Sequence, residues 1–335
     1  MNFYSLLKLN NIIKSRRIKV IGLWLASVMG FRHLSVRLDT SLRCNLACRM
    51  CYFSSEDYRK KAGGILKKEE LEGIAKSLFP HAFQLVIGCG AEPTLVRHYH
   101  ELFALAKKYG VPDKSMVTNG QLLSKNDLEQ LADSGLNELI ISVHGVYRES
   151  YEYLMPGARY AHLLELLENY RQLKDLRGTD SPELRINYTV NPDNLYELND
   201  FFSVFGEFGI STIQLRTVMD IGGEYKGSID EGLKSKYREI VEQIRVESRK
   251  RGVRLLANTS DTDYKEKNKD ASLAALVYTY VSPRTASQLG IDWRSTDLKK
   301  FKKADRWYSR LAEVFFRSKS DEGWLDRSLK YDEIG

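Results

Sequence analysis

The chain has 335 residues with 51 basic and 44 acidic side chains, which gives a formal charge of +7. A hydrophobic content of 43%, with 7 prolines and 23 glycines, excludes fibrous and disordered classes and suits one α/β barrel. The positive charge favours anionic partners, but nothing in the pattern indicates nucleic acid. Three of the four cysteines lie within eight residues, which indicates metal ligation in a reducing compartment rather than a disulfide framework.

The N-terminal segment 1–32 is amphipathic. An apolar run, Val20–Phe31, follows a basic cluster made of Lys14, Arg16, Arg17 and Lys19. This run is shorter than the roughly 20 apolar residues that span a bilayer, and no small-x-small cleavage site clearly follows it. We expect a helix that packs on its own domain or rests on a membrane surface. The expected location is cytoplasmic, with at most weak attachment to the inner face of the membrane.

From about residue 33, short β runs alternate with helical patterns. Leu71, Ile74, Ala75 and Leu78 lie on one face of a predicted helix between the first and second β runs. Ser124 is the expected cap of a later helix that ends at Gly135. The six β runs are Leu34–Asp39, Phe83–Ile87, Lys114–Val117, Glu138–Val143, Leu184–Val190 and Thr212–Val218. Six β/α units predict a parallel sheet covered by helices.

The sequence pattern changes after Gly252. A short β-like run, Val253–Leu256, is followed mostly by helical patterns, including a stripe that runs from Leu298 to Phe315. We therefore predict three parts: the amphipathic segment 1–32, a partial (β/α)6 barrel of the TIM type over 33–252, and a helical extension over 253–335 that closes the barrel mouth.

The cysteine segment has the spacing C-x3-C-x2-C, formed by Cys44, Cys48 and Cys51. Thiolates select zinc, copper(I) or iron–sulfur clusters, and structural zinc needs four ligands. Three thiolates on a cluster of four irons leave one iron open to a ligand. The alternatives are a zinc site completed by Cys89 and a chance group of buried cysteines. If it is not a ligand, Cys89 is a structural thiol at a strand end.

The segment from Cys44 to Tyr52 resembles the cluster motif of the radical S-adenosylmethionine (SAM) superfamily, including the aromatic residue after the third cysteine. Further signatures follow the next strands in order over residues 34 to about 220. They are Gly90-Ala91-Glu92-Pro93, Thr118-Asn119-Gly120, Ser142-Val143-His144-Gly145 and Asn187-Tyr188-Thr189-Val190-Asn191. Ala91 stands where the family has glycine, and His144 stands where many members have aspartate.

The resemblance implies an enzyme with one [4Fe–4S] cluster on the three cysteines, since no cysteine follows Cys89. It implies reductive cleavage of SAM to a 5′-deoxyadenosyl radical, with electrons from a flavodoxin- or ferredoxin-type donor. The residues implied to contact SAM are Gly90, Ala91, Glu92, Pro93, Asn119, Ser142 and Asn187.

Alternation along the later strands places polar side chains on the face that points into the barrel. We expect Arg185 and Arg216 there, beside His144, as candidate catalytic or substrate-binding residues. They favour an acidic small molecule, sugar, nucleotide or lipid-linked substrate. His144 as a hydrogen-bonded lumen residue, and Arg37 paired with Asp39 or Glu92, are the structural alternatives. Two other functions stay open: modification of a peptide or protein, and a non-catalytic iron–sulfur or redox-sensing role.

Overall fold

The computed structural model describes residues 13, 15–219, 221–257, 273–316 and 332–333. Its strands form one curved sheet in the order β8-β1-β2-β3-β4-β5-β6-β7-β9, in which only the β7–β9 pair is antiparallel. The strands are β1 Leu34–Leu38, β2 Ala82–Ile87, β3 Asp113–Thr118, β4 Glu138–Val143, β5 Glu183–Val190, β6 Thr212–Thr217, β7 Arg254–Ala257, β8 Tyr278–Val281 and β9 Asp332–Glu333. The predicted partial barrel and its six β/α units are confirmed.

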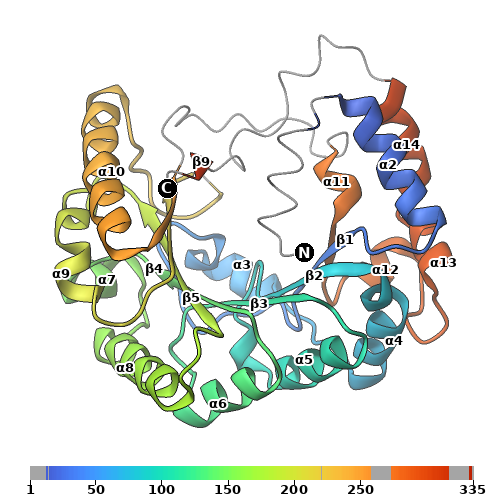
Figure 1. The fold of residues 1–335 in the computed structure, drawn as a ribbon, viewed down its shortest axis with the longest axis horizontal. Coiled ribbons are helices and arrows are strands. Elements are labelled where there is room, and N and C mark those ends of the chain that lie inside the picture. The colour runs from blue at the N-terminus through green and yellow to red at the C-terminus, as the bar shows by residue number, and fades with distance from the viewer. Residues whose placement is uncertain (1–12, 14, 220, 258–272, 317–331, 334–335) are drawn as a thin grey trace.

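Helices cover the outer face of the sheet (Figure 1). Ser124 caps α6, as predicted, and shares a capping box with Asp127. The α-helices are α2 Arg16–Val28, α3 Glu56–Lys61, α4 Lys68–Leu78, α5 His98–Lys108, α6 Lys125–Asp133, α7 Arg148–Leu154, α8 Tyr160–Arg177, α9 Phe201–Phe205, α10 Glu231–Arg251, α11 Ala274–Val277, α12 Thr285–Leu289, α13 Leu298–Ala304 and α14 Trp307–Phe316. Short 3₁₀ helices are η1 Tyr52–Ser54, η2 Phe79–His81, η3 Pro93–Leu95 and η4 Tyr196–Asp200.

The two faces of the sheet differ in polarity, as the alternation predicts. On β5, Leu184, Ile186 and Val190 belong to the main hydrophobic core beneath the helices and are at most 1% exposed. Arg185 and Asn187 alternate with them and are therefore on the inner face. The inner face of β5 therefore carries polar side chains, unlike the aliphatic interior of a closed eight-stranded barrel.

The chain after residue 252 adds two parallel strands to the six that were predicted. The expected β-like run at 253–256 is β7, which pairs with β6. β8 was not predicted; it pairs with β1, and Tyr280 lies opposite Arg37. β8 has only four residues and its partner strand is some 240 residues away, so the local sequence pattern does not identify it as a strand. The rest of the described extension is helical, and closure of the barrel mouth by it stays a prediction, as do the domain boundaries.

The predicted N-terminal helix is present as α2, while the predicted helical residues 1–12 and 14 lie outside the described residues. α2 packs beside α14 at the β1 edge of the sheet (Figure 1). Their contact contains a second small core of Val20, Leu276, Trp307 and Val314. No helix in the described ranges combines the length and the apolar character needed to cross a membrane.

Candidate cofactor site

The three cysteines lie on the loop that follows β1, and backbone hydrogen bonds fasten this loop to other parts of the barrel. The amide of Ala47 donates to the carbonyl of Pro156, and that of Arg49 donates to Leu154, both at 3.0 Å. The Arg49 carbonyl in turn accepts from the amide of Tyr225 at 2.9 Å. The cysteine loop is therefore held from the α7 side and from the segment after β6.

The three thiols are desolvated and lie close enough to influence one another. Burial raises the pKa of Cys44 to about 11, and the nearby Glu92 and Cys51 raise it further. Burial also raises the pKa of Cys48, with Cys44 and Cys51 adding to the effect. Thiols whose negative charges would repel one another in a buried site suit a shared cationic group. A [4Fe–4S] cluster, the cofactor of the superfamily that the motif resembles, is such a group.

A cluster and a single zinc ion need different arrangements of the thiols. Among the described residues, no group of three or more His, Cys, Asp and Glu side chains is arranged to hold one metal ion. A tetrahedral zinc ion draws its thiolates to about 2.3 Å from one centre. In a cluster each cysteine binds a different iron, so the sulfurs stay farther apart. A zinc site completed by Cys89 has no support in this arrangement.

The segment Gly90–Pro93, predicted to contact SAM, is clamped from two sides. The Gly90 amide donates to Asp39 Oδ1 at 3.2 Å, and the Gly90 carbonyl accepts from the Tyr52 hydroxyl at 2.5 Å. Asp39 also accepts from the Tyr280 hydroxyl at 2.6 Å. A Cβ on Gly90 would lie 3.0 Å from Asp39 Oδ2 and 3.2 Å from the Tyr52 oxygen. Tyr52, the aromatic residue after the third cysteine, therefore positions this segment, and glycine allows the close approach.

Glu92 is 2% exposed and joins the loops after β2 and β3. Its Oε1 accepts from the Thr94 amide (3.1 Å), the Thr94 hydroxyl (2.5 Å) and the Thr118 hydroxyl (2.8 Å). Its Oε2 accepts from the Asn119 amide at 2.9 Å. Burial raises the pKa of Glu92, while these hydrogen bonds lower it. The side chain that was expected to meet SAM already accepts four hydrogen bonds within the protein.

Asn119 ties the third strand to the cysteine loop. Its Nδ2 donates to Asn45 Oδ1 at 2.8 Å and lies 3.9 Å from the sulfur of Cys44. Two other predicted SAM contacts, Ser142 and Asn187, are neighbours in register on the inner face of β4 and β5. The structure thus places the predicted cofactor residues at the carboxyl ends of adjacent parallel strands.

His144 directly follows β4. Burial lowers the pKa of its imidazole to about 4, so the ring is neutral at pH 7. Its Nδ1 is buried and has no hydrogen-bond partner among the described residues. Its backbone carbonyl accepts from Asn194 Nδ2 at 2.9 Å. Nδ1 of this neutral imidazole is therefore available to form a hydrogen bond with a ligand or to take part in proton transfer.

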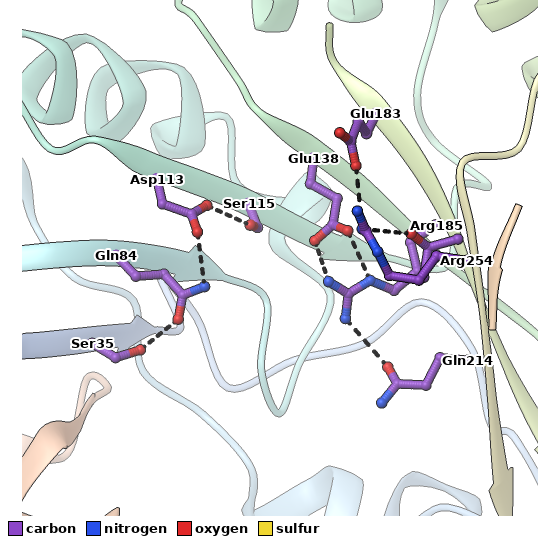
Figure 2. A network of polar contacts seen from close by, with 10 residues as sticks. Ser35, Gln84, Asp113, Ser115, Glu138, Glu183, Arg185, Gln214 and Arg254 are labelled. Atoms are coloured by element: carbon purple, nitrogen blue, oxygen red, sulfur yellow. Dashed lines mark hydrogen bonds and ion pairs between the residues drawn. The ribbon is translucent and has the colours of Figure 1, made fainter. Parts of the chain in front are cut away.

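Arg185, predicted to bind substrate, is engaged by other side chains of the protein, and its role at the substrate stays a prediction. Its guanidinium forms a two-pronged ion pair with Glu138 and also donates to Gln214 (Figure 2). Arg185 lies five residues before Val190, the end of β5, which is roughly 16 Å along an extended strand. It therefore belongs to the opposite end of the barrel from the cysteine loop, and a carboxylate of the protein occupies its fork.

A network of polar side chains lies at this opposite end of the barrel (Figure 2); its labelled members are Ser35, Gln84, Asp113, Ser115, Glu138, Glu183, Arg185, Gln214 and Arg254. The Ser35 hydroxyl donates to Gln84 Oε1 at 2.7 Å, and Gln84 Nε2 donates to Asp113 at 3.3 Å. An ion pair of 3.6 Å joins Arg254 to Glu183. All of these residues are among the first three of their strands. In barrels of this type the amino-terminal end of the strands serves stability, and chemistry takes place at the carboxyl end.

Three other side chains near the carboxyl ends of the strands are exposed to different degrees. Cys89 is exposed, yet burial raises the pKa of its thiol to about 12. Tyr280 is 47% exposed although its hydroxyl is bonded to Asp39. Arg216 is exposed near the carboxyl end of β6, beside Thr189 of β5.

Several positioning residues escaped the sequence analysis. Asp39 could have been found, because an acidic residue ends the first β run on the inner face. Tyr280 had no signal, because its strand was not predicted. Pairing of Arg37 with Asp39 or Glu92 was the structural alternative; in the structure its guanidinium lies over the ring of Tyr278, 4.3 Å from the centroid.

Comparisons with known proteins agree with this arrangement. The family model of the radical SAM superfamily matches residues 38–179, which include the cysteine loop and the signatures after β2, β3 and β4. A curated relative from Saccharolobus solfataricus, named "Probable GTP 3',8-cyclase", is 27% identical over 187 residues, or 56% of this chain. A relative of the same name from Metallosphaera sedula is 24% identical over 206 residues, or 61% of this chain. The chain spans 58% and 62% of the length of these two relatives.

Two solved structures have the same fold at low sequence identity. "Native anSMEcpe with bound AdoMet" has a TM-score of 0.64 and 17% identity, covering 88% of each chain. Streptococcus suis SuiB bound to its precursor peptide SuiA has a TM-score of 0.65 and 17% identity, covering 95% of this chain and 74% of SuiB. The family model, the cysteine motif and this fold together support membership of the radical SAM superfamily, and the matched region is residues 38–179.

Proposed function

We propose that this protein is a radical SAM enzyme that acts on an acidic substrate. The observation that carries the proposal is the group of three desolvated thiols on the loop after β1, next to the clamped Gly90–Pro93 segment. Cys44, Cys48 and Cys51 would hold the cluster. When bound, the cluster and SAM would supply reductive cleavage to a 5′-deoxyadenosyl radical, which removes a hydrogen atom from the substrate or adds to it.

The protein's own residues position the reactants and shield them. The Gly90 amide donates to Asp39, and the Gly90 carbonyl accepts from the Tyr52 hydroxyl; these two hydrogen bonds fix the backbone of Gly90, whose segment would receive the amino group of SAM. Glu92 links that segment to the loop after β3, because its carboxylate accepts a hydrogen bond from the Asn119 amide. Ser142 and Asn187 would complete the SAM surface from the sheet. A chamber walled by protein limits side reactions of a reactive intermediate.

Two residues are proposed to meet the substrate. Arg216 lies on the inner face near the carboxyl end of β6, where a guanidinium can bind a carboxylate or phosphate bidentately. His144 offers a neutral imidazole in the same end of the barrel. A phosphate-bearing substrate agrees with the name of the curated relatives, which refers to GTP. A small molecule, sugar, nucleotide or lipid-linked intermediate with an acidic group remains the proposed substrate class.

The proposed partners follow from this chemistry. A flavodoxin- or ferredoxin-type protein would supply the low-potential electron. We place the enzyme in the cytoplasm, where thiols stay reduced.

The function is tested with anaerobically reconstituted protein. The expected result is about four irons and four sulfides per chain and slow release of 5′-deoxyadenosine from SAM with dithionite. Cys51→Ala should abolish both, whereas the matched variant Cys89→Ala should keep the cluster. Stoichiometric zinc in place of iron, or an intact cluster that never cleaves SAM, would overturn the proposal; the second result would favour a redox-sensing role.

The substrate class needs a separate test. Arg216→Lys keeps the charge but loses the bidentate fork. It should lower turnover of the true substrate more than SAM cleavage without substrate. An equal loss of both would assign Arg216 to SAM, and turnover of a neutral peptide would favour the peptide-modifying alternative.

A further inference from the structure

The helix α2 presents an apolar stripe to the outside of the molecule. Its members are Ile18 (59% exposed), Ile21 (46%), Trp24 (45%), Leu25 (43%) and Val28 (65%). They recur every three or four residues and so lie on one side of the helix. Scattered exposed apolar residues are ordinary, but a contiguous stripe of this kind marks an interaction surface.

The stripe is exposed even though α2 packs against the rest of the fold. The other side of α2 is already buried, since Val20 is 1% exposed and packs with Trp307 and Val314. α2 therefore has two apolar sides, and the residues that the structure describes bury only one of them. Helices that lie at a membrane surface bury such an apolar side among the lipids.

A buried lysine fixes α2 to the C-terminal helices. Lys302 of α13 is 1% exposed and donates to the Ser27 hydroxyl at 2.5 Å and to His33 Nε2 at 2.6 Å. His33 Nδ1 lies 2.6 Å from the carbonyl of Phe31, so Nδ1 carries the hydrogen and Nε2 accepts from the lysine. The Lys302 ammonium also lies 3.8 Å from the ring centroid of Trp307. We call the unit of α2, α13 and α14 the α2 platform; its contacts make it a fixed part of the fold.

The charges around the stripe identify its partner. Along α2, Arg17 is exposed, Arg16 and Lys19 are half-buried, and the helix contains no Asp or Glu. On α13, Lys299, Lys300 and Lys303 are exposed as well. An apolar stripe with a tryptophan and a basic surrounding matches the interface of a bilayer that contains anionic lipid. We propose that the α2 platform docks the protein on the surface of such a bilayer.

Docking through α2 leaves the cofactor site accessible. α2 leads into the amino-terminal end of β1 through His33, and the cysteine loop leaves the carboxyl-terminal end of the same strand. The platform and the cysteines are thus at opposite ends of β1. The proposal concerns only binding and stands whether or not the proposed enzymatic activity is confirmed.

The test is sedimentation of the full-length protein with vesicles. We expect binding to vesicles of about three parts phosphatidylcholine to one part phosphatidylglycerol, several-fold weaker binding to pure phosphatidylcholine, and a decrease with added salt. Ile21→Gln and Leu25→Gln should each reduce partitioning about tenfold, because each removes apolar area from the contact. Leu176→Gln is the matched control, since Leu176 is 76% exposed on α8. It should bind like the unchanged protein.

Three results would overturn the proposal. They are absence of vesicle binding, an equal loss with Leu176→Gln, and a dimer in light scattering that becomes monomeric with Ile21→Gln. The last would assign the stripe to a second copy of the chain. Circular dichroism of each variant checks that the fold is retained, which we expect because these side chains are exposed.

Discussion

Replacing Arg185 by methionine should destabilise the fold without impairing the cofactor site. The Arg185 and Glu138 side chains are 13% and 10% exposed, and the guanidinium binds both carboxylate oxygens. Arg185→Met leaves the Glu138 carboxylate buried without its cation. Breaking a buried pair in this way costs roughly 3–5 kcal/mol of unfolding free energy. The loss is large compared with the roughly 5–15 kcal/mol that stabilises a typical domain.

Urea unfolding, followed by circular dichroism under anaerobic conditions, measures this change. The double variant Glu138→Leu/Arg185→Met replaces the pair by apolar groups and should recover most of the lost stability. Arg148→Met is the matched control, because the Arg148–Glu152 pair at 3.3 Å is exposed (71% for Arg148) and should leave the stability almost unchanged. Unchanged stability of Arg185→Met together with loss of substrate turnover would refute the reasoning and return Arg185 to a substrate-binding role.

Two further predictions concern other buried polar groups. Glu92→Gln puts an amide where Thr94 and Asn119 donate, so the free energy of unfolding should fall by roughly 2–4 kcal/mol in urea unfolding; unchanged stability with weakened SAM binding would instead assign Glu92 to the ligand. Burial lowers the pKa of His33 in the folded protein from 6.5 to about 4. The unfolded state therefore binds the proton more readily, and the free energy of unfolding should fall as the pH drops from about 6.5 to 4. The full loss is roughly 3 kcal/mol. His33→Gln should reduce that slope in unfolding measured across this range, though His144 contributes in the same direction; an unchanged slope would contradict the assignment.

Local patterns in the sequence were sufficient to predict six of the parallel strands and the position of the cysteine loop. The alternation on β5 predicts its two faces because a strand has a period of two and helices cover only one face. The C-x3-C-x2-C spacing predicts the cluster loop because the three ligands lie within eight residues. The Ser124 cap and the six β runs are local features in the same sense, and they agree with the structure to within one or two residues.

Only the tertiary structure shows which polar side chains form ion pairs or hydrogen bonds with residues distant in sequence. Alternation places Arg185 on the inner face correctly, but it does not show that Glu138, 47 residues away, occupies the guanidinium. The clamp on Gly90 depends on Tyr280, which reaches Asp39 through a strand pairing across 241 residues. Likewise, the sequence marks α2 as amphipathic, and only packing against α14 shows which side is buried and which is left exposed. Contacts of this range are set by the closure of the sheet and by helix packing, which no short window of sequence records.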